Sequence, residues 1–144
     1  MQAELKQLRT EMNKMGTAVA YTLYQQQQGP ANERLREVLA AAKAENPSDK
    51  ILDDLVLALT LDPSANVRLR AIEALYPHAE RELVRAGVLA ALPREQNPLV
   101  QLELIDFVGA TQDENAAPVL EKIAGDEAAN TSVRDAAKTV LAQL

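Results

Sequence analysis

Apolar residues recur at steps of three and four along most of the chain, which predicts amphipathic α-helices. In the first segment they form the narrow a/d seam of a heptad rather than the wider stripe of a core helix. We therefore predict a long amphipathic helix, the arm, over residues 1–28, which either pairs with a second copy of the chain or packs along its own domain. Its seam consists of Leu5, Leu8, Met12, Met15 and Val19.

Two breaks separate this arm from the rest of the chain. Gly29-Pro30 follows four glutamines and ends the first helix, because glycine terminates helices readily and proline disfavours a helical residue before it. A second helix is predicted over about 31–44, and Asn46-Pro47 ends it. Ser48 is then a good N-cap for the helix that follows.

From Asp49 onward a two-helix pattern repeats every 33 residues. Val67, Val100 and Val133 mark the second helix of each unit, and in the first two units apolar residues follow four, five and eight positions later. An earlier helix is predicted in each unit, over about 51–61, 83–92 and 117–124. A fixed period with two helices per unit predicts an all-α solenoid, in which neighbouring pairs bury each other's apolar faces. We place the repeat domain at 29–144, with units at about 49–79, 80–112 and 113–144.

The third unit departs from this pattern. Its inter-helix turn is two residues longer, and Lys138 replaces the apolar residue found five positions after the valine in the other units. A lysine on the face that would meet a further repeat is typical of a terminal cap.

Composition narrows the chemistry of the chain. Its 144 residues include no cysteine and one histidine, and the five glycines form no phosphate-binding motif. Disulfide scaffolds, thiolate zinc sites and cysteine nucleophiles are therefore excluded. The net charge of −6 disfavours nucleic-acid binding, because the phosphate backbone is also negative. We expect no cofactor, no metal and no enzymatic activity, and no apolar run reaches the length of a membrane span.

The side chains that could carry chemistry have simpler structural interpretations. His78 lacks a candidate nucleophile or orienting partner, so we expect a solvated residue near a helix end. Paired carboxylates occur mostly at predicted helix starts or turns, where the helix dipole favours negative charge. Arg68 and Arg134 occupy the same position in two units. We expect them to form an inter-repeat ladder with acidic turn residues such as Asp62, Glu95 or Asp126, although an exposed basic contact for a partner is the alternative.

The segment Asp62–Leu75 reads DPSANVRLRAIEAL and resembles a HEAT repeat of the short bacterial type. The third unit repeats the Val-Arg motif of this segment at Val133 and Arg134. The middle unit has Glu95 in place of the aspartate and Gln101 in place of the arginine. The resemblance implies a right-handed stack whose second helices line a concave side, a surface that commonly binds proteins. The second-helix positions expected to be exposed there are Arg70, Glu73, Gln101, Glu103, Asp106 and Asp135.

Phe107 is a further candidate on this side. It lies just outside the apolar triplet of its helix, so partial exposure would let it anchor a partner. The alternative is that it fills a groove between units.

Residues 5–38 add a narrower similarity. The segment LKQLRTEMNKMGTAVAYTLYQQQQGPANERLREV is similar to the C-terminal region of bacterial membrane-anchored proteins that begin with a zinc-finger anti-sigma-factor domain. The resemblance implies that residues 1–28 are a stalk after a membrane helix not included in this sequence, with the repeats on the extracytoplasmic side. The histidine-and-cysteine zinc motif is absent, so no zinc-binding or sigma-binding residue is carried over.

The sequence thus favours a non-enzymatic protein-interaction or scaffold module, which belongs to a bacterial membrane-anchored regulator on the narrower resemblance. A soluble cytoplasmic adaptor is one alternative. Another is an enzyme subunit similar to the phycobilin lyases, which also contain HEAT-like repeats. The scarcity of aromatic residues, 3% of the chain, argues against a tetrapyrrole site.

Overall fold

A computed structural model describes residues 29–144 of the chain. The predicted arm, with its seam residues, lies outside the described residues. The α-helices of the described part are α2 (Ala31–Ala42), α3 (Asp49–Leu61), α4 (Ala65–Leu75), α5 (Glu82–Ala91), α6 (Pro98–Thr111), α7 (Ala117–Gly125) and α8 (Thr131–Gln143). Short 3-10 turns at Tyr76–His78, Leu92–Arg94 and Glu114–Ala116 follow α4 and α5 and precede α7.

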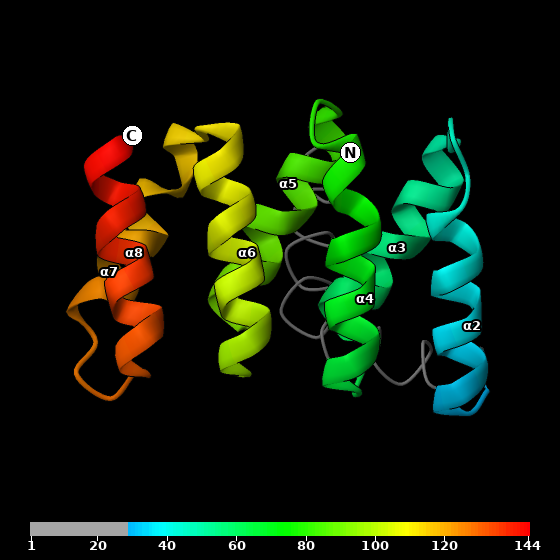
Figure 1. Cartoon of the computed structure of the whole chain (residues 1–144), viewed down its shortest axis with the longest axis horizontal. Helices are drawn as coiled ribbons and strands as arrows, with labels where there is room; N and C mark the ends of the chain where they lie inside the picture. Colours follow the sequence, from blue (N-terminus) through cyan, green and yellow to red (C-terminus); the bar gives the residue numbers. More distant parts are fainter. Residues whose placement is uncertain (1–28) are drawn as a thin grey trace, which may run out of the picture.

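The helices form two layers (Figure 1). Helices α2, α4, α6 and α8 stand side by side in one layer, and α3, α5 and α7 lie behind them. Within a pair, α3 packs on α4 and α7 packs on α8, while α2–α4, α4–α6 and α6–α8 contacts join successive units. The predicted all-α solenoid of stacked helix pairs is therefore confirmed. Helix α2 extends the second-helix layer beyond the three predicted pairs.

The 33-residue period is set locally by helix caps. The N-caps of α4, α6 and α8 are Ser64, Asn97 and Asn130, and each side-chain oxygen accepts a backbone N–H of the first turn. Such caps satisfy donors that have no partner inside the helix, which fixes where each helix begins. The predicted cap at Ser48 is also present, since its hydroxyl accepts the Ile51 N–H.

The periodic apolar positions build one continuous core. Val67, Val100 and Val133 are each at most 1% exposed. The predicted triplets behind the first two valines are buried, and in the third unit Lys138 is exposed as expected. The buried triplet residues are Ala71, Ile72, Leu75, Leu104, Ile105 and Val108.

Among the helices of residues 29–144, none has the length and apolar character needed to cross a bilayer.

Candidate functional site

A network of buried ion pairs joins the second helices along one edge of the stack. Its first pair is Arg34 of α2 with Asp62, which lies in the α3–α4 turn. Arg34 Nε donates to Asp62 Oδ2 at 2.7 Å and Nη2 donates to Oδ1 at 3.2 Å. The third nitrogen, Nη1, donates to the Gly29 carbonyl at 2.8 Å, so the guanidinium also binds the backbone just before α2. The Asp62 side chain is 0% exposed.

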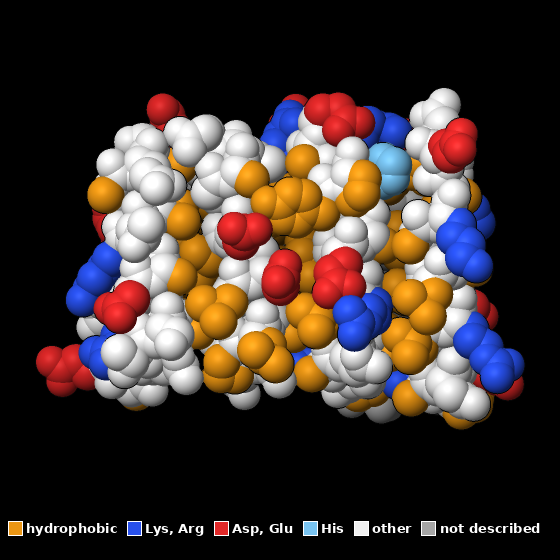
Figure 2. All heavy atoms as spheres, viewed as in Figure 1, with side chains coloured by type: hydrophobic (Ala, Val, Ile, Leu, Met, Phe, Trp, Pro, Cys, Tyr) orange, Lys and Arg blue, Asp and Glu red, His pale blue; other side chains and the backbone are white. Residues whose placement is uncertain are grey.

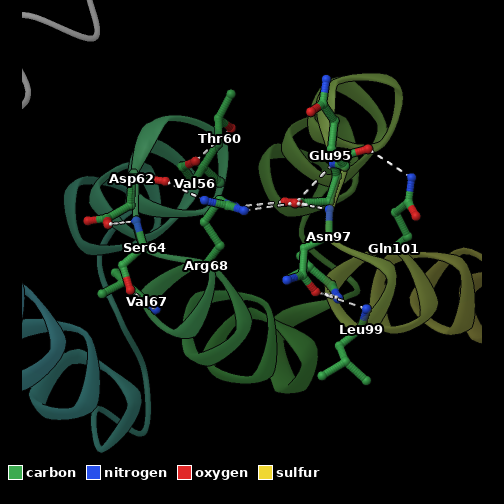
Figure 3. A network of polar contacts seen from close by, with 12 residues as sticks. Val56, Thr60, Asp62, Ser64, Val67, Arg68, Glu95, Asn97, Leu99 and Gln101 are labelled. Carbon is green, nitrogen blue, oxygen red and sulfur yellow. Dashed lines mark hydrogen bonds and ion pairs between the residues drawn. The ribbon is translucent and has the colours of Figure 1, made fainter.

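The second pair, Arg68 with Glu95, repeats this geometry one unit further on (Figure 3). Arg68 Nε and Nη2 donate to the two oxygens of Glu95 at 2.8 and 3.0 Å, and Nη1 donates to the Asp62 carbonyl at 2.8 Å. Glu95 also accepts the N–H groups of Gln96 and Asn97, at 3.1 and 3.0 Å. The Glu95 carboxylate therefore stabilises the α5–α6 turn and also binds Arg68 of the preceding unit. We call Arg34, Asp62, Arg68 and Glu95 the ladder.

The ladder ends at Gln101, which occupies the arginine position of the second unit. Its Nε2 donates to the Glu95 carbonyl at 2.9 Å, the bond that Nη1 makes in Arg34 and Arg68. The predicted ladder is confirmed for Arg68 and wrong for Arg134, which makes no ion pair within the described residues. Asp126 was a predicted ladder acid, but its carboxylate accepts the Ala128 N–H of its own turn at 2.9 Å.

A shallow cavity of about 250 Å³ lies beside the Arg68–Glu95 pair, between the α3–α4 and α5–α6 turns. Asp62, Arg68, Arg94 and Glu95 contribute its charged lining. Of these, only Arg94 is exposed and makes no ion pair among the described residues, so the cavity is chiefly the space above the ladder.

The outward side of α4 and α6 carries the other predicted partner residues. Arg70 and Glu73 of α4 form an ion pair at 2.8 Å with both side chains more than two-fifths exposed. Glu103 and Asp106 of α6 make no ion pair within the described part of the chain. Figure 2 views this side and shows acidic side chains at its centre among apolar ones. We call Arg70, Glu73, Glu103 and Asp106 the second-helix face.

Leucines accompany these charges. Leu69, Leu99 and Leu102 each precede an acidic residue of the face by four positions, so each shares a helix side with it. Leu99 is 64% exposed, and the other two are half-buried. The face therefore combines negative charge with accessible apolar area.

Tyr76 fixes the position of Asp106 across the boundary between units. Its hydroxyl donates to Asp106 Oδ2 at 3.0 Å, and its ring meets the Phe107 ring edge-on at 5.3 Å between centroids. Burial raises the pKa of Tyr76, as do the hydrogen bond to Asp106 and the negative charges of Asp106 and Glu103. The two carboxylates of α6 thus act together on one hydroxyl of the neighbouring unit.

Two predicted partner residues have other surroundings. Phe107 is 1% exposed, so the expectation of partial exposure is wrong, and the residue instead fills the space between units against Tyr76. Gln101 is half-buried with its amide bonded to the α5–α6 turn. Asp135 is exposed on α8, as expected. Whether any of these residues binds a partner stays a prediction.

Residues 29–144 offer no cluster of three or more histidine, aspartate or glutamate side chains that could hold a metal ion. His78 lies half-buried in the 3-10 turn after α4, near a helix end as predicted. The ladder was the feature that sequence reasoning captured least completely. Arg34 was missed because Glu33, rather than valine, precedes it, so the repeated pattern does not mark this position.

Comparison with protein-family models matches residues 52–142 to HEAT repeats. No curated protein matches the chain, and no solved structure matches it.

Proposed function

Because the chain belongs to the HEAT repeat family, with residues 52–142 matched, we propose that it is a non-enzymatic interaction module whose second-helix face binds a protein partner. One observation carries the proposal: Glu103 and Asp106 stand beside accessible leucines without a cationic partner in the described residues. Accessible apolar area bordered by charged residues is typical of a surface that binds another protein.

The chemistry of the face defines the partner. Arg70 neutralises Glu73, which leaves the carboxylates of Glu103 and Asp106 as the net charge of the face. A complementary segment carries lysine or arginine flanked by apolar side chains that cover Leu69, Leu99 and Leu102. Complementary charge at such a surface speeds association and suppresses wrong partners.

The ladder supports this function by holding the face rigid. The Arg68–Glu95 pair and the Tyr76–Asp106 bond each join one unit to the next, so the spacing of α4 and α6 is set before a partner arrives. A preorganised surface loses less conformational freedom on binding than a flexible one.

For the cellular context, we propose that the chain is the extracytoplasmic part of a bacterial membrane-anchored regulator of the anti-sigma-factor-like kind. The support is the similarity of residues 5–38 to the stalk region of such proteins. Sequencing the native gene upstream of Met1 tests it. An apolar span of about 20 residues preceded by a histidine-and-cysteine zinc motif is the expected result. A gene that starts at Met1 rejects this context and makes the chain a soluble adaptor.

Site-specific photo-crosslinking in the native cell tests the partner face. A photoreactive residue replaces Glu73 on the second-helix face or, as the matched control, Asp53, an exposed acid on α3 in the other layer. We expect protein adducts from position 73 and none from position 53. Adding Glu103→Lys and Asp106→Lys should remove those adducts by reversing the local charge. Equal adducts at both positions, or none at position 73, reject the proposal.

A further inference from the structure

Arg134 stands at the ladder position of the last described unit, and it lacks the partner that this position has elsewhere. It follows Val133 as Arg68 follows Val67. Its Nη2 donates to Thr131 Oγ1 at 3.4 Å. Its Nε is buried and has no hydrogen-bond acceptor within the described residues. A buried guanidinium donor without an acceptor is unfavourable, because it has lost water and gained nothing in exchange.

The other three positions follow a consistent rule. Arg34 and Arg68 direct Nε to an acid, and each acid lies two residues before the N-cap of the next second helix. The second helix that follows Gln101 is capped by Asn130, and the residue two before this cap is Ala128. A guanidinium is therefore present where the residue two before the next cap is acidic, and an amide where that residue is Ala128. By this rule Arg134 is matched to a carboxylate on whatever packs against α7 and α8.

A second cation, Lys138, lies close to Arg134 on α8. Lys138 lies one turn after Arg134 on the same side of α8 and is exposed. In the preceding units this position holds Ile72 and Ile105, which the stack buries. Helix α8 thus carries two cations one turn apart on the same side.

We propose that this α7–α8 end is a second docking face, which receives a helix pair of a partner protein with Asp or Glu two residues before its second N-cap. That carboxylate pairs with the Arg134 guanidinium, which turns away from Thr131 to meet it, and lies near Lys138. A second copy of this chain stacked head-to-tail does not meet the requirement, because the residue two before the Pro30 cap of α2 is Gln28. This face is separate from the second-helix face, and either can exist without the other.

The test supplies a helix pair of known sequence at this end. Residues 76–112 of the chain, which contain α5, α6 and the Glu95 turn, are fused after Leu141 so that the 33-residue period continues. The fused pair stands in for the partner at high effective concentration. Four proteins form a double-mutant cycle: the fusion, Arg134→Gln, Glu95→Gln in the fused copy, and both changes together.

We expect the fusion to gain helical circular dichroism, and the two substitutions to be coupled by about tenfold or more in the unfolding constant. The Arg134 Nε–H signal should shift in nuclear magnetic resonance spectra. A parallel set of the four proteins carries Lys138→Ile. It serves as a control in case Lys138 by itself prevents the fused helix pair from stacking on α8. If neither set shows coupling, the proposal is wrong.

Sedimentation velocity of the natural chain tests whether a second copy of the chain, rather than a different protein, occupies the α7–α8 end. We expect Arg134→Gln to leave its oligomeric state unchanged. An oligomer of the natural chain that Arg134→Gln abolishes would instead assign this end to a second copy and overturn the assignment to a different protein.

Discussion

The strongest test of the fold is the replacement of Glu95 by glutamine, which keeps the shape of the side chain and removes its charge. Four donors converge on the Glu95 carboxylate: two from Arg68 and the backbone N–H groups of Gln96 and Asn97, at 2.8 to 3.1 Å. An amide offers one oxygen in place of two and directs its own N–H groups at these donors. Glu95→Gln therefore leaves a nearly buried guanidinium without its counter-ion.

The size of the effect follows from burial. The side chains of Glu95 and Arg68 are 4% and 18% exposed, so solvent compensates little. Removing one partner of a buried pair costs about 3–5 kcal/mol. We expect about 3 kcal/mol here, at the lower end, because Arg68 retains its bond to the Asp62 carbonyl and some contact with water. This is a large share of the roughly 5–15 kcal/mol that stabilises a typical domain.

Urea unfolding followed by circular dichroism measures this loss. The matched control is Asp126→Asn, which changes the exposed acid of the third turn and should cost no more than about 0.5 kcal/mol. Adding Arg68→Gln to Glu95→Gln should cost at least about 1 kcal/mol less than the sum of the single changes. If Glu95→Gln costs no more than Asp126→Asn, or the two ladder changes add, the ladder does not stabilise the stack as argued.

Two further predictions concern the packing between units. The folded state raises the pKa of Tyr76, so its contribution to stability is complete below pH about 10 and is lost as pH rises through the folded pKa. Tyr76→Phe should therefore flatten the fall in unfolding free energy at alkaline pH, and an unchanged fall would contradict a raised pKa for Tyr76 in the folded state. At Gly87, a Cβ atom would lie 2.7 Å from both methyl carbons of Val56, so Gly87→Ala should lower the thermal midpoint despite the better helix propensity of alanine. Gly125→Ala has open space at its Cβ and serves as the control, and a stabilised Gly87→Ala would show that α3 and α5 separate easily.

The apolar spacing of the sequence was sufficient to predict the helices and the core. Val67, Val100 and Val133 are buried because the helical period alone decides which residues share a side. Lys138 was correctly expected on the exposed side for the same reason. The caps at Ser64, Asn97 and Asn130 also act within a few residues, so they too could have been found from the sequence.

Contacts between units were predicted less well, because each depends on how one helix pair sits on the next. The Arg68–Glu95 pair was expected from the repeated Val-Arg motif, but Arg34 was missed because α2 does not contain this motif. Phe107 has a sequence position that fits either an exposed anchor or a groove filler. Its burial follows from Tyr76, 31 residues earlier in the chain, whose ring packs against it edge-on.

The sequence by itself thus determined the helical elements, their 33-residue period and the side of each helix that faces the core. The tertiary structure alone decided which polar groups of different units become partners: Arg34 with Asp62, and Tyr76 with Asp106. The physical reason is the range of the interactions. Helix periodicity and caps act over a few residues, whereas ion pairs and ring contacts between units join residues about 30 positions apart and form only when the stack brings them within a few ångströms.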